Sequence, residues 1–303
     1  MEKFILSEKK KANIKEKLFI LALLFYPLAN FAVFYIGVNA NSILLAFQNV
    51  DINGKFLGVT LDNFKIVYDK VTLTGGEYVQ GFKNSIIWYL ISTFFSFTLT
   101  ILFAYYVYKK CILGKTFKLI IMLPAIISPV CVALMFEKFV VSLPVFFSTL
   151  GVQLPNFFRD SEYVFSTNLF YSLWGSFGSS VLIYSNTMTG IDSGVVESAR
   201  IDGVTNVQEI WYITIPLLMP TIATYMTTGV VSILGNQGPL YLFYEYDAPY
   251  ETTLVGYLMF KETMRLGSQN YPVMSAMGMI MTMITFPVVM LVKNLMQKLD
   301  PTN

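Results

Sequence analysis

The fold is decided by residues 197–220, which read ESARIDGVTNVQEIWYITIPLLMP and lie between two strongly apolar segments. Asp192 or Ser193, just before this stretch, can cap a short helix that runs to about Asp202. Gly203 then stands where a helix commonly ends on a residue in the left-handed conformation. A polar run with both a start and a stop signal is predicted to be folded.

A second helix is predicted directly after this glycine. Thr205 and Gln208 have the spacing of a capping box, in which each side chain bonds the backbone N–H of the other residue. Pro216 and Pro220 then lead the chain into the next apolar segment. The stretch is therefore expected to be a rigid helix–glycine–helix element. The alternative interpretation is a surface loop with well-formed caps.

Composition and long apolar runs predict an all-α integral membrane protein. The 303 residues are 55% hydrophobic and 13% charged, whereas about a quarter of the residues of a soluble domain are charged. Apolar runs long enough to cross a bilayer predict six transmembrane helices. They cover about residues 18–38, 85–108, 119–141, 167–189, 217–238 and 272–292.

Two of these runs need comment. The first follows a basic segment, as a secretory signal does, but it is longer than the usual ~7–15 residues and is interpreted as an uncleaved span. The third contains Pro124 and Pro129, so it is expected to kink.

Several kinds of chemistry are excluded by the residues available. The chain has no histidine, and its two cysteines, Cys111 and Cys131, are too few for a metal site. Gly114-Lys115-Thr116 suggests a phosphate-binding loop, but that motif needs a glycine where Lys109 stands. The chain is therefore expected to carry no metal and no cofactor of its own, and nothing in it predicts nucleic-acid binding.

Ionisable residues inside spans mark ion and proton relays, and the second, fourth, fifth and sixth runs contain none. Glu137 and Lys138 lie near the outer end of the third. A carrier driven by protons or sodium ions would usually need such groups at depth, so the energy for transport is expected to come from elsewhere. A structural membrane anchor is the alternative without transport.

The distribution of lysine and arginine predicts that both termini are cytoplasmic. With this orientation, short cytoplasmic pieces hold the early lysines, Lys109, Lys110, Arg200 and Lys293. The basic residues of the outer connections lie in longer stretches and are balanced by acids. The helix–glycine–helix element is then placed on the cytoplasmic side.

The same element resembles the EAA loop of the permeases of ABC importers. The family pattern is roughly E-A-A, two residues, D-G-A, then Q, an aromatic residue, and I-T-L-P followed by P. It is carried here by Glu197, Ala199, Asp202, Gly203, Gln208, Trp211, Ile213, Thr214, Pro216 and Pro220. Ser198 and Val204 replace two alanines with other small residues.

A second, less specific resemblance lies earlier in the chain. Gly58, Asp62-Asn63-Phe64 and Asn84-Ser85 resemble segments that many sugar permeases carry before their next helix. These residues support the family without pointing to any chemistry.

The resemblance implies a type I importer permease with a cytoplasmic coupling helix that docks on a separate ATPase. It divides the chain into a basic segment (1–17), a first span (18–38), an extracytoplasmic segment (39–84), a five-helix permease core (85–292) with a coupling loop (192–216), and a cytoplasmic tail (293–303). The residues expected to couple to the ATPase are Glu197, Ser198, Ala199, Asp202 and Gly203.

The partners that the resemblance implies are a second, related permease, two ATP-binding subunits that hold ATP and Mg²⁺, an extracytoplasmic solute-binding protein and the lipid bilayer. The expected location is the bacterial inner membrane. The chain itself is expected to perform no covalent chemistry.

The solute is expected to be a carbohydrate, because polar and aromatic side chains occur together on the fourth and fifth runs. The candidate residues of the path are Tyr171, Trp174, Tyr184, Tyr225, Thr228, Asn236 and Gln237. Each also has a structural interpretation, as an interfacial anchor or as a side chain bonded to its own helix. Two alternatives stay open: a permease of the same architecture for a peptide, amino acid or phosphorylated polyol, and an ATP-independent carrier or channel.

Overall fold

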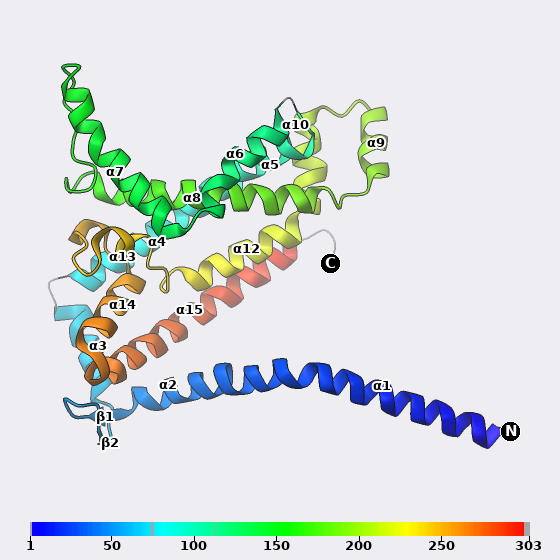
Figure 1. Cartoon of the computed structure of the whole chain (residues 1–303), viewed down its shortest axis with the longest axis horizontal. Helices are drawn as coiled ribbons and strands as arrows, with labels where there is room; N and C mark the ends of the chain where they lie inside the picture. The colour runs from blue at the N-terminus through cyan, green and yellow to red at the C-terminus, as the bar shows by residue number, and fades with distance from the viewer. Residues whose placement is uncertain (1, 74–75, 112, 300–303) are drawn as a thin grey trace. The chain divides into compact units, whose positions relative to one another are not determined.

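The computed structural model describes residues 2–73, 76–111 and 113–299, with side chains between 2 and 14 left aside (Figure 1). Residue 1 of the expected basic segment, residues 74–75 of the expected extracytoplasmic segment, residue 112, and residues 300–303 of the expected tail lie outside the described residues. The chain forms two compact units, one of residues 1–67 and 266–279 and the other of residues 68–265 and 280–303.

The first unit begins with a long helical run. It consists of α1 (Glu2–Asn30), the π-helical segment η1 (Phe31–Gly37) and α2 (Val38–Ala46). A short antiparallel hairpin follows, in which β1 (Gln48–Val50) pairs with β2 (Phe56–Val59). The buried amide of Asn63, at the start of α3 (Asp62–Leu73), donates to the carbonyls of Ala46 and Gln48 at 2.9 and 2.8 Å. This asparagine therefore joins the end of the long helix to the hairpin.

The second unit is built around two long helical runs. The first contains α4 (Glu77–Phe95), the π-helical segment η2 (Ser96–Thr100) and α5 (Ile101–Tyr108). The second is α8 (Val164–Met188), which packs against α5 and against α6 (Gly114–Ile126). The shorter α7 (Pro129–Ser148) follows α6.

The rest of this unit carries the predicted loop and the later helices. The loop contains α9 (Ser193–Ile201), α10 (Asn206–Glu209), the π-helical segment η3 (Ile210–Thr214) and α11 (Ile215–Leu217). It leads into α12 (Met219–Ser232), and α13 (Leu240–Tyr244) and the 3₁₀ turn η4 (Tyr250–Thr252) follow. Next comes α14 (Val255–Leu266). The 3₁₀ turn η5 (Gly267–Asn270) and the long α15 (Tyr271–Leu299) follow in the chain, with η5 and α15 up to Met279 belonging to the first unit.

Each end of the α4–α5 run is fixed to a different connection. At its start, the buried Asn84 side chain donates to the carbonyls of Glu251 and Thr253, both at 2.9 Å. At its end, Lys109 pairs with Glu209 of the loop. The loop and the connection around residues 251–253 therefore lie at opposite ends of the same run.

The predicted number of six spans is not confirmed. In the described residues, four helices are long and apolar enough to cross a membrane: Lys15–Ala46, Glu77–Tyr108, Pro129–Ser148 and Val255–Leu299. A fifth results if Asn206–Leu217 and Met219–Ser232, bent by 66°, form one span. The predicted fourth run lies within α8, a continuous helix of 25 residues that is not among these four.

The prediction of one kinked helix over residues 119–141 is wrong. The chain leaves the helix after Ile126, and Figure 1 shows α6 and α7 running in different directions. Ile127 is extended, with ψ 151°, and Ser128 has ψ 129°. The residue before a proline is driven out of the helical region, so Pro129 starts a new helix instead of bending the old one.

Candidate functional site

The predicted first helix of the loop exists with the predicted caps. The Asp192 side chain accepts a 2.9 Å hydrogen bond from the backbone N–H of Gly194, and α9 begins at the next residue, Ser193. Gly203 has φ +79°, the left-handed conformation in which a side chain would be strained. Its N–H donates to the Arg200 carbonyl at 3.1 Å. The stop signal read from the sequence is thus a real backbone turn.

The predicted capping box is also present. The Thr205 N–H donates to Gln208 Oε1 at 2.9 Å, and the Gln208 N–H donates to Thr205 Oγ1 at 3.4 Å. The element is therefore a pair of short helices around a glycine turn, as the spacing predicts.

Most of the five residues predicted to couple face outward. Glu197, Ser198, Asp202 and Gly203 are exposed, whereas Ala199 is buried. A Cβ atom built on Gly203 would meet no other atom within 4 Å. Beside these residues, Ile201 has 86% of its surface exposed. The loop thus presents an open surface of charged, small and apolar groups.

The loop continues into α12 through a bend. The π-helical η3 and the short α11 follow α10, and the helix axis turns by 66° before α12. Ile210, Ile215 and Leu218 are buried in a core that also contains Tyr105 of α5 and Tyr184 of α8. The loop therefore packs against α5 and α8 and continues into α12.

One polar contact of this region was missed by the sequence reasoning. Lys109 Nζ donates to Glu209 Oε2 at 2.7 Å and lies 2.5 Å from Oε1, without hydrogen-bond geometry to that second oxygen. The side chains of Lys109 and Glu209 are 13% and 3% exposed. The Tyr105 and Tyr108 rings lie 5.2 and 5.7 Å from the same ammonium. Lys109 had been counted only as an orienting charge, and no local pattern pairs residues so far apart.

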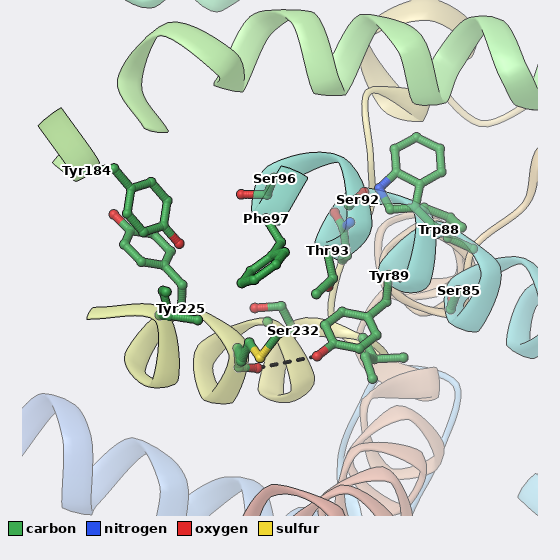
Figure 2. A pocket seen from close by; sticks show the side chains of 16 residues that line it. Ser85, Trp88, Tyr89, Ser92, Thr93, Ser96, Phe97, Tyr184, Tyr225 and Ser232 are labelled. Atoms are coloured by element: carbon green, nitrogen blue, oxygen red, sulfur yellow. Dashed lines mark hydrogen bonds between the residues drawn. The ribbon is translucent and has the colours of Figure 1, made fainter. Parts of the chain in front are cut away.

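A cavity lies between α4, η2, α8 and α12 (Figure 2). Its volume is about 210 Å³. Hydroxyl groups of Ser85, Ser92, Ser96 and Ser232 line it, together with Thr93 and the amide of Asn236. None of its lining residues is Asp, Glu, Lys or Arg.

Aromatic rings form much of the wall of this cavity. Tyr184 of α8 and Tyr225 of α12 pack with ring centroids 5.4 Å apart, and Figure 2 shows them side by side at one end. Trp88 and Tyr89 of α4 lie at the other end. The Tyr89 hydroxyl donates to the Met226 carbonyl at 3.4 Å, which joins α4 to α12.

A second cavity, of about 600 Å³, lies beside the first and shares Trp88, Ser92, Ser96 and Asn236 with it. It reaches along the small-residue face of α8, where Ser176 and other small residues line it. Its lining also contains no Asp, Glu, Lys or Arg. The two cavities are therefore neighbours in the second unit, and neither has a charged side chain in its lining.

The structure brings some predicted path residues to this region and leaves others away from it. Tyr184, Tyr225 and Asn236 line the first cavity, and Tyr171 and Asn236 line the second. Thr228 and Gln237 line neither. The Thr228 hydroxyl donates to the Thr224 carbonyl of its own helix at 2.8 Å, the structural interpretation considered above.

Trp174 belongs to an aromatic cluster around Phe136. Its ring centroid lies 6.0 Å from that of Phe136, and the Tyr171 and Phe243 rings lie 5.0 and 6.2 Å from it. Trp174 also lines a mostly apolar hollow of about 360 Å³ beside α6. These contacts indicate a packing role for Trp174.

The residues of α4 were missed by the sequence reasoning. Trp88, Tyr89, Ser92 and Ser96 line the first cavity, but the sequence search considered only the fourth and fifth runs. The spacing of 88, 92 and 96 by four residues places them on one helix face. That periodicity was the available signal.

Few other groups suggest reactive chemistry. Burial raises the pKa of the Tyr244 phenol above its ordinary value, so this group stays neutral. Its oxygen accepts from Asn168 Nδ2 at 3.1 Å, and the buried Asn168 Oδ1 has no hydrogen-bond partner. Among the described residues, no three His, Cys, Asp or Glu side chains are grouped to hold a metal ion.

Comparison with known families gives a match over most of the chain. Residues 85–302 match the family described as "binding-protein-dependent transport system inner membrane component". The match includes α4 from Ser85 onward, α5, both cavities and the whole loop.

The individual relatives have low sequence identity to this chain, and each alignment covers most of both proteins. The chain is 25% identical over 240 residues to the multiple sugar-binding transport system permease protein MsmF of Streptococcus mutans, which covers 77% of this chain and 78% of that protein. It is 26% identical over 252 residues to the probable ABC transporter permease protein YesP of Bacillus subtilis, with 80% and 79% covered. It is also 26% identical over 252 residues to the osmoprotective compounds uptake permease protein GgtC of Synechocystis, with 76% and 82% covered.

A solved structure has the same fold. It belongs to a bacterial ABC transporter involved in the import of the acidic polysaccharide alginate. The TM-score is 0.77 at 20% sequence identity, with 96% of this chain and 99% of that chain covered. A second structure of an alginate transporter, in complex with an alginate pentasaccharide-bound periplasmic protein, also has a TM-score of 0.77 at 20% identity, with 96% and 98% covered.

Proposed function

Because the chain belongs to the family of binding-protein-dependent transport system inner membrane components, we propose that it forms part of the translocation path of an ATP-driven importer for a neutral oligosaccharide. The chain is a permease of the type I ABC importer fold, and it lies in a membrane.

The carbohydrate is supported mainly by the neutral cavity. Sugar rings bind to aromatic faces through their C–H groups and to hydroxyls and amides through hydrogen bonds, and ligand sites combine such apolar walls with a few placed polar groups. Trp88, Tyr184 and Tyr225 supply the faces, while Ser92, Ser96 and Asn236 supply the polar groups. The relative MsmF is named for multiple sugars, which agrees with this solute class.

An oligosaccharide is favoured over a single sugar by the space available. The first cavity, of about 210 Å³, adjoins the second, of about 600 Å³, and four residues stand in the wall of both. A solute longer than one sugar unit can occupy such a region. This single observation, a neutral region of aromatic and hydroxyl groups across two cavities, carries the proposal.

The partners proposed for this chain are a second, related permease, two ATP-binding subunits and an extracytoplasmic binding protein. ATP and Mg²⁺ are held by the ATP-binding subunits, so this chain has no catalytic step of its own. The exposed face of α9 supports docking on an ATP-binding subunit, with Glu197, Ser198, Asp202 and Gly203 accessible. Ala199, buried beneath them, supports the helix from within.

In this mechanism, closure of the ATP-binding subunits moves α9 and α10, and the cavity turns outward to receive the solute. Hydrolysis returns the loop and opens the cavity inward. We propose that both termini and the loop lie on the cytoplasmic side, as the distribution of lysine and arginine favours. The contacts of Asn84 and Lys109 at different ends of the α4–α5 run support opposite sides of the membrane for the loop and residues 251–253.

The test is uptake by the complete complex in lipid vesicles. Neutral oligosaccharide and a matched uronic-acid oligosaccharide are supplied with the binding protein of the same system, with and without ATP inside. ATP-dependent uptake of the neutral solute supports the proposal. Flux without ATP would favour a carrier, and uptake of a peptide or amino acid in place of the sugar would overturn the solute class.

A second solute class is favoured by one comparison. The relative GgtC is named for osmoprotective compounds, and small uncharged polyols share the hydroxyl chemistry of sugars. A competition assay with such a polyol in the same vesicles separates the two solutes.

A further inference from the structure

We propose that the buried Lys109–Glu209 ion pair is the link through which the loop moves the α4–α5 wall of the cavity. This makes both residues positioning residues for transport. The inference rests on the proposed function, since it requires a motor that pushes on the loop.

The pair is held tightly enough to act as a link. Glu209 is 3% exposed and Lys109 is 13% exposed, so neither charge can exchange its partner for bulk water without moving. The Tyr105 and Tyr108 rings flank the ammonium at 5.2 and 5.7 Å. Separating two buried charges leaves each without compensation, which is strongly unfavourable. The loop and the end of α5 are therefore expected to move together.

The position of the pair gives it a function beyond stability. Glu209 is the last residue of α10, inside the loop, and Lys109 directly follows α5. The α5 helix is continuous through η2 with α4, and this run supplies Ser96 of η2 and Trp88 of α4 to the cavity. A displacement of the loop reaches one wall of the cavity by this route.

The loop is joined to the opposite wall of the cavity, formed by α12, through the polypeptide chain itself. The loop continues through η3 and α11 into α12, which supplies Tyr225 and Ser232. This covalent route includes the 66° bend before α12. The loop is thus joined to both walls, to one by peptide bonds and to the other by the ion pair. Loss of the pair would leave α5 joined to the loop by their shared apolar core and by the 3.5 Å hydrogen bond from the Tyr105 hydroxyl to Asn206 Oδ1, neither of which is a charge–charge contact.

The packing between the two routes supports the same conclusion. Ile210 and Ile215 from the loop share a core with Ile101 and Tyr105 of the α5 segment. The same core contains Tyr184 and Ile222, which also line the cavity. Apolar contacts alone can slide, because they have no preferred direction, whereas an ion pair fixes one point of each element to the other.

The test uses the complete complex with Glu209→Gln, Lys109→Met and the exchanged pair Lys109→Glu/Glu209→Lys. Lys110→Met is the matched control, since Lys110 is the neighbouring exposed lysine. Solute taken up per ATP hydrolysed is measured with the yield of assembled complex. We expect either single variant to lower this ratio by about fivefold or more, the lower limit of typical coupling between sites. The exchanged pair should recover at least half of it.

Unchanged solute per ATP in both single variants would overturn the proposal. So would an equal fall in ATP hydrolysis, uptake and assembled complex, with no recovery in the exchanged pair, because that pattern indicates folding alone. If a single variant does not assemble, the exchanged pair still tests the proposal, since the link predicts at least half of the normal solute-per-ATP ratio for it.

A second readout needs no solute. Ser96→Cys is introduced after Cys111 and Cys131 are changed to serine, and its labelling rate by a maleimide is compared with and without ATP and vanadate. In the otherwise unchanged complex the rate should differ between the two conditions. Glu209→Gln should abolish that difference while ATP hydrolysis continues.

This labelling rate distinguishes a failure of the proposed function from a failure of the Lys109–Glu209 link. If the rate does not respond to nucleotide even with Lys109 and Glu209 in place, the proposed function fails. If it responds equally with Glu209→Gln, only the link fails.

Discussion

The backbone of Gly178 lies directly against the carbonyl of Ile121: a Cβ atom built on Gly178 would sit 1.9 Å from the Ile121 oxygen. No side chain can occupy this point without separating α8 from α6. Small residues that allow close helix contact are typical of membrane helices, and here one glycine sets the distance between two helices.

We predict that Gly178→Ala destabilises the protein. The two backbones must move apart, and overpacking of this kind costs about 1–3 kcal/mol or more. Thermal unfolding of the purified complex should show a lower midpoint. Gly175→Ala is the matched control, because a Cβ there meets nothing within 4 Å. A stability equal to that of the control would show that the helices are free to separate.

Gly203→Pro should abolish transport and leave membrane insertion intact. The φ of Gly203 is +79°, whereas proline fixes φ near −65°, and the substitution also removes the hydrogen bond to Arg200. The turn between α9 and α10 cannot form, so the exposed face of α9 is misplaced. Uptake and membrane yield are measured together.

Asparagine tolerates the left-handed conformation, so Gly203→Asn serves as the comparison and should keep most of the uptake. Normal uptake by Gly203→Pro would show that transport does not require the turn between α9 and α10.

Glu197→Lys should weaken binding of the ATP-binding subunits. The carboxylate is exposed on α9 and can pair with an arginine or a backbone donor of the partner. Reversal of its charge should lower the amount of ATP-binding subunit that co-purifies with the permease. Glu197→Gln keeps the shape and separates charge from size. An unchanged co-purification yield for Glu197→Lys would argue against a contact at this residue.

Tyr225→Ala should reduce uptake more than Thr228→Ala. The Tyr225 ring packs on Tyr184 in the wall of the cavity, while Thr228, on the same helix, bonds its own backbone and lines neither cavity. Loss of one aromatic contact is expected to weaken solute binding by about tenfold, equivalent to about 1.4 kcal/mol. Initial uptake rates over a range of solute concentrations measure this. Equal effects of the two substitutions on uptake would indicate that the solute path does not run along this wall of the cavity.

The sequence predicted features whose causes are local. The Asp192 cap, the left-handed Gly203 and the Thr205–Gln208 box all depend on residues within a few positions, and all three are confirmed. The match of the loop to a family pattern depends on the same short range. Where a structural feature depends only on neighbouring residues, a single sequence is sufficient to predict it.

Features that depend on distance along the chain were not predictable in the same way. Lys109 and Glu209 are a hundred residues apart, and Gly178 meets Ile121 only because α6 folds back on α8. The break at Ile127–Ser128 was foreseen only as a kink, since the prolines indicate a disturbance without fixing its size. The apolar length of a run likewise does not fix where its helix ends.

The π-helical segment η3 has a consequence for Ile210 and Ile215. On a regular α-helix, residues five apart point about 140° away from each other, so one of the two would face outward. Hydrogen bonding from i to i+5 brings such residues to the same side, and both isoleucines are buried. An extra residue is accommodated here as a widened turn instead of a bulging loop. Removal of one residue from this turn would therefore rotate everything after it and turn an isoleucine out of its core.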